Sequence, residues 1–356
     1  MYPALAVLQE LESKRLQILW VGGQGGMEQE LVGRAGYEIH ALPAAGLHGV
    51  GLRALPGNLV TILQGFFAAR KLLKDFAPDT LFFTGGFVAA PIALAGSKIP
   101  TLAFVPDIKP GFTLKLISRF ADKIAIVTNS SKAYFSKQKR LNTTGYPLRQ
   151  ELSAWSKARA LKHFSLSHQF KTLLVFGGSK GAQSINLALQ SALPLLLKEM
   201  QIIHILGKGN WSASKNIAKG LPEKLRINYR PFPYLHDDMG AALSASDLVL
   251  SRAGASILGE YPLFQLPAIL VPIPMKAHIQ HLNAAYLEKK GAAQVLPDGE
   301  MSEKLRQSVI QTINDDTLLK SMSSAMRKLA RPNAAKDIAA LLLEIHANRQ
   351  KEIATA

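Results

Sequence analysis

Short apolar runs alternate with longer amphipathic stretches along most of the chain. The strand-like runs lie at residues 17–22, 80–83, 101–104 and 123–127 in the first half and at 172–176, 202–206, 247–250 and 268–271 in the second. Continuous apolar strands separated by helices are typical of parallel sheets that are covered on both faces. The pattern therefore predicts an α/β protein with two doubly wound parallel-sheet domains.

Turn residues and a lapse of strand signals mark the expected domain boundary. Gly145-Tyr-Pro-Leu-Arg149 is followed by a polar stretch from Ser153 to Gln169. We expect a first domain over residues 1–148, a linker over 149–170, a second domain over 171–335, and a C-terminal helix over 336–356 that packs back on the first domain.

The chain opens on a helical pattern, although a doubly wound domain opens on a strand. Pro3 suits the first turn of a helix, and leucines recur every three residues on one face of residues 2–14. We therefore expect the first strand and its Gly-rich turn to lie upstream of Met1, in a natural product that begins earlier.

The composition favours an anionic partner. Lys and Arg number 42 against 25 Asp and Glu, a formal charge of +17, and the segment from Lys109 to Arg140 holds eight cations against Asp122, a local balance of +7. Nucleic acid, an anionic lipid surface or a phosphorylated substrate would suit this charge, and a solvated basic face is the simpler alternative. No zinc-finger or RNP pattern accompanies the cations, so we expect no nucleic-acid partner.

Cysteine is absent, which excludes disulfides, a thiolate nucleophile and Cys-ligated metal sites. No apolar run reaches the roughly 18 residues of a membrane span, and the first residues lack a signal-peptide pattern. These features predict a soluble, unsecreted protein.

Two Gly-containing turns in the second half are candidate phosphate sites. After the run at 247–250, Gly254 allows close backbone approach, Ser256 could cap a helix, and Glu260 lies about one turn further, where its carboxylate could accept hydrogen bonds from a ribose. Phe176-Gly-Gly-Ser-Lys-Gly-Ala-Gln183 is the second such turn, and it matches neither a dinucleotide fingerprint nor a P-loop. An ordinary strand-to-helix turn is the alternative for both.

Several ordered motifs together resemble the MurG family over nearly the whole chain. The motifs are Thr84-Gly-Gly-Phe87, Pro110-Gly111, Gly145-Tyr-Pro-Leu-Arg149, Gly177-Gly-Ser-Lys-Gly-Ala182, Asp237-Asp-Met239, Ser251-Arg-Ala-Gly-Ala-Ser256 with Glu260, Leu266-Pro-Ala-Ile-Leu-Val-Pro272 and Gln280-His-Leu-Asn-Ala284. This family comprises the UDP-N-acetylglucosamine to N-acetylmuramyl-pentapeptide pyrophosphoryl-undecaprenol N-acetylglucosaminyltransferases of peptidoglycan synthesis. The resemblance implies the GT-B fold, which consists of two Rossmann-like domains.

Carried over by position, the resemblance implies a set of donor-binding residues. Glu260 would hold the ribose of UDP, and Leu235-His236 would present backbone to uracil. Gln280 and Asn283 would meet the GlcNAc hydroxyls, although Asn283 could instead cap or bridge loops. The residues assigned to the diphosphate and its surroundings are Arg149, Gly178, Ser179, Arg252, Gly254, Ala255 and Ser256. A local acid is the alternative partner for Arg149.

The first domain would bind the acceptor, an undecaprenyl-diphosphate-linked sugar. The implied acceptor residues are Gly85, Gly86, Phe87, Pro110 and Gly111. In the family's reaction the acceptor's 4-hydroxyl attacks the anomeric carbon of GlcNAc while UDP leaves, with inversion. Helix N-termini, backbone N–H groups and Arg149 would stabilise the leaving charge, so we expect no metal and no cofactor.

The catalytic base is the point where this sequence departs from the family. The family histidine lies in a Gly-Gly-Thr-Gly-Gly-His turn that would precede Met1. The family's Glu-Gln-Asn is replaced by Val105-Pro-Asp-Ile-Lys109, so Asp107 is a candidate base, with helix capping as the alternative.

A helical stripe in the first domain is a candidate membrane contact. Its apolar residues are Leu59, Ile62, Leu63, Phe66 and Phe67, and the cations Arg70, Lys71 and Lys74 follow. Such a helix could dock on an anionic bilayer and hold the enzyme as a peripheral protein on the cytoplasmic face of the cell membrane. A core helix whose cations complement its dipole is the alternative.

Three other functions stay open at this point. The first two are other GT-B enzymes of similar fold, a diacylglycerol glycosyltransferase and a UDP-GlcNAc 2-epimerase. An inactive UDP-sugar-binding protein would keep the donor half without the missing turn. The preferred prediction is an inverting N-acetylglucosaminyltransferase that converts lipid I to lipid II and so supports cell-wall synthesis, cell shape and division.

Overall fold

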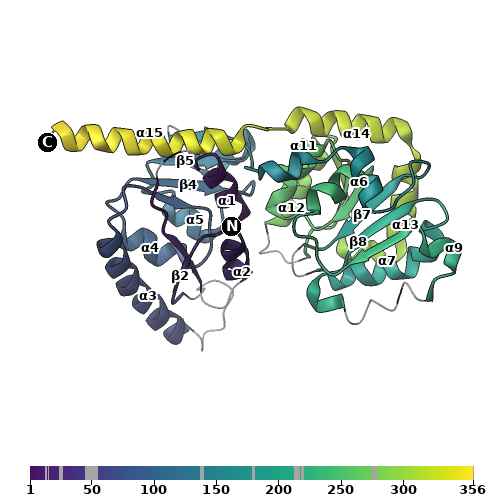
Figure 1. The fold of residues 1–356 in the computed structure, drawn as a ribbon, viewed down its shortest axis with the longest axis horizontal. Coiled ribbons are helices and arrows are strands. Elements are labelled where there is room, and N and C mark those ends of the chain that lie inside the picture. Colours follow the sequence, from purple (N-terminus) through teal and green to yellow (C-terminus); the bar gives the residue numbers. More distant parts are fainter. Residues whose placement is uncertain are drawn as a thin grey trace. The chain divides into compact units, whose positions relative to one another are not determined.

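The computed structural model describes residues 1–12, 14, 16–23, 27–44, 55–136, 140–178, 181–211, 217, 220–274 and 279–355. The chain divides into two compact units: Met1–Arg149 together with Asn333–Ala356, and Gln150–Pro332. Each unit contains parallel β-sheet and covering helices (Figure 1). The predicted α/β fold class is confirmed.

The first unit contains a two-stranded sheet, β1-β2, and a four-stranded parallel sheet in the order β3-β4-β5-β6. The strands are β1 (Trp20–Gly23), β2 (Ile39–Leu42), β3 (Leu81–Phe83), β4 (Thr101–Val105), β5 (Lys123–Ile126) and β6 (Leu141–Thr143). The helices are α1 (Tyr2–Gln9), α2 (Met27–Arg34), α3 (Leu55–Phe76), α4 (Ala89–Ala95), α5 (Phe112–Ile117), η2 (Asn129–Tyr134) and α15 (Ala334–Thr355).

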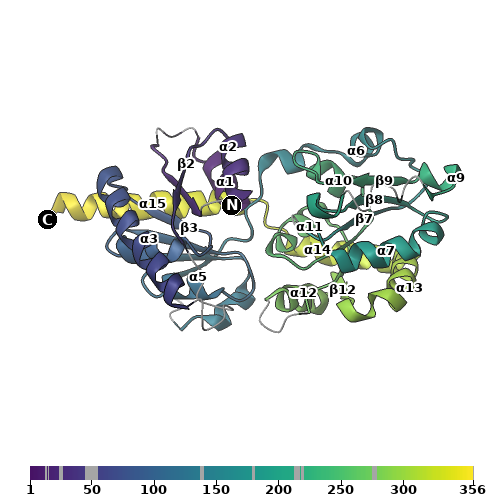
Figure 2. The ribbon, with the colours of Figure 1, turned by 90° about the horizontal axis from the view of Figure 1, so that it is seen from below.

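Burial on both faces explains why the central strand of this unit is continuously apolar. All five residues of β4 are buried. The C-terminal helix α15 packs on α1, β4 and β5, on the side of these strands away from α3 and α4 (Figures 1 and 2). Lys123 at the start of β5 forms an ion pair with Glu344 of α15. The C-terminal helix therefore belongs to the first unit.

The second unit is built on a six-stranded parallel sheet in the order β12-β11-β10-β7-β8-β9. Its strands are β7 (Thr172–Phe176), β8 (Gln201–Ile205), β9 (Tyr229–Phe232), β10 (Leu248–Ser251), β11 (Ala268–Leu270) and β12 (Ala293–Val295). The order reverses between β7 and β10, as in the Rossmann topology. Ligands of such sheets bind beyond the carboxyl ends of the strands at this reversal.

Helices cover both faces of the six-stranded sheet (Figures 1 and 2). They are η4 (Gln150–Ala154), α6 (Lys157–His163), α7 (Gln183–Leu196), η5 (Lys208–Asn210), α9 (Glu223–Arg226), α10 (Met239–Ala245), η7 (Ala255–Leu258), α11 (Glu260–Phe264), α12 (Gln280–Lys289), η8 (Asp298–Glu300), α13 (Met301–Asn314) and α14 (Asp316–Leu329). Ile185, Leu189 and Leu193 recur at every fourth position of α7 and are buried in the core.

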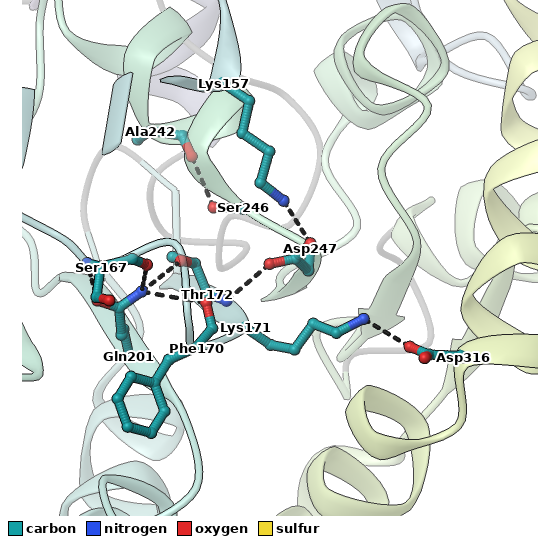
Figure 3. A network of polar contacts seen from close by, with 10 residues as sticks. All are labelled: Lys157, Ser167, Phe170, Lys171, Thr172, Gln201, Ala242, Ser246, Asp247 and Asp316. Carbon is teal, nitrogen blue, oxygen red and sulfur yellow. Dashed lines mark hydrogen bonds and ion pairs between the residues drawn. The ribbon is translucent and has the colours of Figure 1, made fainter. Parts of the chain in front are cut away.

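Residues 150–170, where the sequence suggests a linker, fold onto the second unit. Figure 3 shows the polar network that holds the end of this segment at the amino-terminal edge of the sheet. Lys157 forms an ion pair with Asp247, whose other carboxylate oxygen accepts a 2.8 Å hydrogen bond from the Thr172 N–H. The Gln201 side-chain amide donates to the Ser167 carbonyl at 2.8 Å. The carboxyl ends of the strands, beyond which ligands of such sheets bind, lie at the opposite end of the sheet.

Candidate active site

The turn after β7 has the backbone that its glycines predict. Gly178 and Gly181 have φ values of 88° and 76°, and the Gly181 N–H donates to the Gly178 carbonyl at 2.9 Å. A Cβ on Gly177 would lie 2.2 Å from the Ala182 nitrogen, so a larger residue would disrupt the turn. Ala182, the N-cap of α7, provides no side-chain cap. The amino end of a long helix therefore follows a tight glycine turn, whose Ser179 lies outside the described residues.

The turn after β10 differs from the expected helix start. Gly254 is the N-cap of the short 3₁₀ helix η7, and Ser256 lies inside η7, so the expectation that Ser256 caps a helix is wrong. Its hydroxyl instead donates to Glu260 Oε2 at 2.9 Å. Glu260 is the first residue of α11 and is partly exposed. The serine therefore fixes one carboxylate oxygen at the position predicted to meet a ribose.

A buried tyrosine supports the turn after β10 through a side-chain hydrogen bond. The Tyr261 and Ser251 hydroxyls lie 2.6 Å apart, and both residues are fully buried. Burial raises the pKa of Tyr261 far above its ordinary value of 10, so its hydroxyl stays protonated and can share a hydrogen bond with Ser251. The end of β10 is thereby joined to α11, which begins with Glu260.

Two predicted sugar-binding residues lie on the first turns of α12. Asn283 is fully buried, and its side-chain amide donates to the Ala253 carbonyl at 3.1 Å. Gln280 accepts a 3.2 Å hydrogen bond from the Ile273 N–H. The structure thus shows Asn283 bridging two segments, which was its alternative interpretation, while Gln280 stands beside the segment that leads to the undescribed residues 275–278.

The predicted uracil-binding residues follow β9. Leu235 is buried, and the ring centroids of His236 and Tyr234 are 4.4 Å apart. The Lys208 ammonium lies 5.7 Å from the centroid of the Tyr234 ring. Asp238, further along the same loop, lies 3.2 Å from His163 Nε2. Aromatic and charged side chains thus surround the loop at the carboxyl ends of β8 and β9.

Arg252 is engaged by neighbouring residues of its own unit. Its Nη1 lies 2.5 Å from Asp298 Oδ1 and donates to the Val271 carbonyl at 3.1 Å. Its Nη2 donates to Ser184 Oγ at 2.7 Å, and this hydroxyl donates to the same Asp298 oxygen at 2.9 Å. The side chains of Arg252 and Asp298 are only 12% and 17% exposed.

The predicted acceptor residues lie in two loops of the first unit. Gly85 and Gly86 follow β3 with φ values of 113° and 94°, and Phe87 beside them is 60% exposed. Pro110 is buried, and Gly111 is the N-cap of α5. The strands β3 and β4 are adjacent and parallel, so these loops leave the same edge of the sheet.

The candidate base and the predicted arginine also lie in this unit. Asp107 is partly buried in the bend between β4 and α5. The N-cap residue of α5 is Gly111, four residues after Asp107. The Arg149 guanidinium carbon lies 4.6 Å from the centroid of the Tyr2 ring, a cation–π contact within the first unit.

The helix α3 exposes much of its predicted apolar stripe. Leu59, Leu63 and Phe67 are 62%, 56% and 58% exposed, while Ile62 and Phe66 are partly buried. Arg70, Lys71 and Lys74 continue the exposed face. Gly65 lies on the opposite, buried face. The core-helix alternative therefore does not describe the three most exposed residues, and no helix among the described residues is long and apolar enough to span a membrane.

Both units match known glycosyltransferase domains. Residues 1–126 match the glycosyltransferase family 28 N-terminal domain, and residues 172–340 match the family 28 C-terminal domain. The UDP-N-acetylglucosamine--N-acetylmuramyl-(pentapeptide) pyrophosphoryl-undecaprenol N-acetylglucosamine transferase of Natranaerobius thermophilus is 36% identical over 352 residues, covering 96% of this chain and 95% of the relative. The chain belongs to this family of glycosyltransferases. The protein of the same name from Listeria monocytogenes is 34% identical and covers 97% of this chain and 96% of its own.

Solved structures agree with this membership. The crystal structure of Acinetobacter baumannii MurG is 26% identical, has a TM-score of 0.73, and covers 96% of this chain and 95% of that one. The Neisseria meningitidis UDP-GlcNAc 2-epimerase bound to UDP-GlcNAc has a TM-score of 0.65 over 96% of both chains, but at 15% identity it shows the shared fold alone. The MurG resemblance and the GT-B fold are confirmed.

The family's donor motifs converge on one edge of the second unit. The turns after β7 and β10, the loop after β9 and the start of α12 all lie at or beyond the carboxyl ends of the parallel strands. Arg149 and the acceptor residues belong to the first unit. Sequence reasoning missed Ser184, Asp298 and Tyr261, because none of them stands in a recognisable motif. No group of three or more His, Asp or Glu side chains within the described residues is arranged to hold a metal ion.

Proposed function

We propose that this glycosyltransferase moves GlcNAc from UDP-GlcNAc to the 4-hydroxyl of an undecaprenyl-diphosphate-linked N-acetylmuramoyl-pentapeptide. The observation that carries this proposal is the match over nearly the whole chain to relatives whose name states that reaction. The same match covers both domains, so it supports both the donor and the acceptor half. No specific feature favours an epimerase or a diacylglycerol glycosyltransferase.

The donor half of the proposal rests on the second unit. Glu260 accepts hydrogen bonds from the ribose hydroxyls, because Ser256 already orients its carboxylate. The diphosphate lies against the backbone of the turn at Gly178 and the amino end of α7, where helix N–H groups attract negative charge. Backbone groups of Leu235 and His236 meet the uracil, and Gln280 meets the GlcNAc.

The reaction proceeds by direct displacement. The acceptor oxygen forms a bond to the anomeric carbon of GlcNAc while the bond from that carbon to the β-phosphate oxygen of UDP breaks, which inverts the configuration. Asp107 takes the proton of the attacking hydroxyl. The charge on the departing UDP is stabilised by the amino end of α7.

We further propose that the enzyme works as a peripheral protein at the cytoplasmic face of the membrane. The exposed Leu59, Leu63 and Phe67 would enter the interfacial region of an anionic bilayer, and Arg70 and Lys71 would meet its headgroups. This arrangement brings the first unit to its lipid-linked acceptor, whose diphosphate would lie near Gly85 and Gly111.

The test is transfer of labelled GlcNAc from UDP-GlcNAc to a purified lipid-linked N-acetylmuramoyl-pentapeptide, with diacylglycerol and no acceptor as parallel reactions. Product with the first acceptor alone supports the proposal. Product with diacylglycerol, or epimerised sugar without an acceptor, would refute it.

Asp107→Asn should abolish transfer while calorimetry still shows UDP-GlcNAc binding, and Asp75→Asn, at an exposed position of α3, is the matched control. Near-normal turnover of Asp107→Asn would exclude that residue as the base.

A further inference from the structure

One guanidinium connects the loops that surround the proposed donor site. Arg252 follows β10, and its partner Ser184 is the second residue of α7, directly beyond the glycine turn. Val271 follows β11, and Asp298 begins η8, the segment after β12. Segments that follow four of the six strands, β7, β10, β11 and β12, therefore meet at a single side chain.

Both terminal nitrogens of the Arg252 guanidinium are directed at the protein. A guanidinium has five N–H donors and no acceptor. Both terminal nitrogens of Arg252 are engaged, Nη1 by Asp298 and main-chain carbonyls and Nη2 by Ser184. The carboxylate of Asp298 also offsets the positive charge locally, so the pair presents little net charge to an anion in the adjacent turns.

We infer that Arg252 is a positioning residue, which Asp298 and Ser184 hold so that it fixes the relative placement of the glycine turn and the turn at Gly254–Ser256. It is not a ligand of the donor diphosphate. The inference deepens the proposed function and rests on it. The Ser184 contact carries the effect to α7, because a hydroxyl that both receives from Arg252 and donates to Asp298 has one orientation. The diphosphate then meets backbone N–H groups that are already in place.

The two roles predict opposite effects of removing Asp298. If Arg252 were a ligand of the diphosphate, Asp298→Asn would release its side chain, and the variant would bind a diphosphate equally well or better. If Arg252 is a positioning residue, Asp298→Asn removes the contact that orients it, the two turns lose their common support, and binding of the diphosphate weakens. Arg252→Gln should then weaken binding to about the same extent, because either change breaks the same connection.

The experiment is a double-mutant cycle on full-length protein, with UDP affinity measured by calorimetry. Arg252→Gln and Asp298→Asn should each raise the Kd for UDP about 10-fold, and the double variant should be no worse than either single one. An unchanged or lower Kd for Asp298→Asn would overturn the inference. A double variant near 100-fold, the product of two independent losses, would also overturn it.

Steady-state kinetics separate positioning from general loss of fold. The KM for UDP-GlcNAc should rise in Asp298→Asn while the KM for the lipid-linked acceptor stays unchanged, whereas a fall in active enzyme alone would lower kcat and leave both KM values unchanged. Ser184→Ala, a milder change, should raise the Kd for UDP several-fold even if the charge variants do not fold, and a normal Kd would count against the inference. Asp316→Asn removes an exposed ion pair with Lys171 (Figure 3) and is the matched control. Failure of the unaltered protein to bind UDP would overturn the proposed function, and this inference with it.

Discussion

A buried histidine should make the second unit less stable at mildly acidic pH. His204 on β8 is 1% exposed, with Nδ1 2.8 Å from the Tyr229 hydroxyl and Nε2 3.0 Å from Asn186 Oδ1. Burial lowers the pKa of His204 from 6.5 to about 3, because the imidazolium would lose its hydration inside the core. The folded chain therefore keeps this ring neutral, and the ring links α7 to β8 and to the edge strand β9.

The sign follows from which state binds the proton. Because the folded pKa lies below the unfolded pKa, the unfolded chain takes up the proton first, and stability is complete above about pH 6.5 and falls as the pH decreases towards about 3. At about pH 5 the difference in protonation lowers the free energy of unfolding by about 2 kcal/mol. That amount is a large part of the stability of an ordinary domain.

Tryptophan fluorescence can report this unit by itself. The chain has three tryptophans, and Trp20→Phe leaves Trp155 and Trp211, which both belong to the second unit. Urea unfolding of this variant is compared with that of the same variant carrying His204→Gln, at about pH 7.5 and about pH 5. The protein that retains His204 should lose about 2 kcal/mol more over this interval than the protein that carries His204→Gln. Equal losses would show that His204 does not titrate as burial requires, since other groups contribute equally to both proteins.

Three further predictions test separate parts of the molecule. Glu260→Gln should raise the Kd for UDP about 10-fold in calorimetry but leave that for 2′,3′-dideoxy-UDP unchanged, and equal losses would refute the ribose contact. Leu63→Ser should reduce sedimentation with anionic vesicles, whereas Leu187→Ser, at a leucine of nearly equal exposure in the other unit, should not; equal behaviour would exclude α3 as the membrane contact. Gly65→Ala should destabilise the first unit by about 1–3 kcal/mol in urea unfolding, because its Cβ would lie 2.3 Å from the Pro43 carbonyl oxygen, and Gly57→Ala in open space should be harmless.

The sequence predicts the buried strands well and misses most of the strands at the edges of the sheets. The runs at 101–104 and 172–176 correspond to β4 and β7, which are central and almost wholly buried. The strands β2, β6, β9 and β12 were not predicted, and each lies at the edge of its sheet, although the edge strands β1 and β3 were predicted. An edge strand is paired on one side and tolerates polar residues and proline, as Arg230 and Pro231 in β9 illustrate. The continuous apolar pattern is therefore lost in strands that do not have to be buried on both sides.

The donor site shows a similar division between what is local and what is not. The spacing of Ser256 and Glu260 places the two side chains together, and their hydrogen bond confirms that proximity. The spacing does not reveal that Ser256 lies inside a 3₁₀ helix, η7, which ends at Leu258 and is followed by Gly259. The role of Arg252 depends on Asp298, which is distant in sequence. The local motif therefore predicts, by itself, that the arginine binds the ligand.

Charge distribution connects the two halves of the proposed mechanism. The segment from Lys109 to Arg140, with a balance of +7 in a chain of +17, lies entirely in the first unit, as do the cations that follow the exposed stripe of α3. In the second unit, Asp298 offsets Arg252, and the proposed diphosphate contacts are backbone N–H groups. Backbone dipoles bind a phosphate at a fixed place, whereas exposed cations attract any anionic surface at a range that salt shortens. The formal charge is divided almost evenly between the two units, so it is the gathering of the first unit's cation excess in one segment that would serve a diffuse electrostatic task, apart from the geometry-dependent task of the backbone N–H groups.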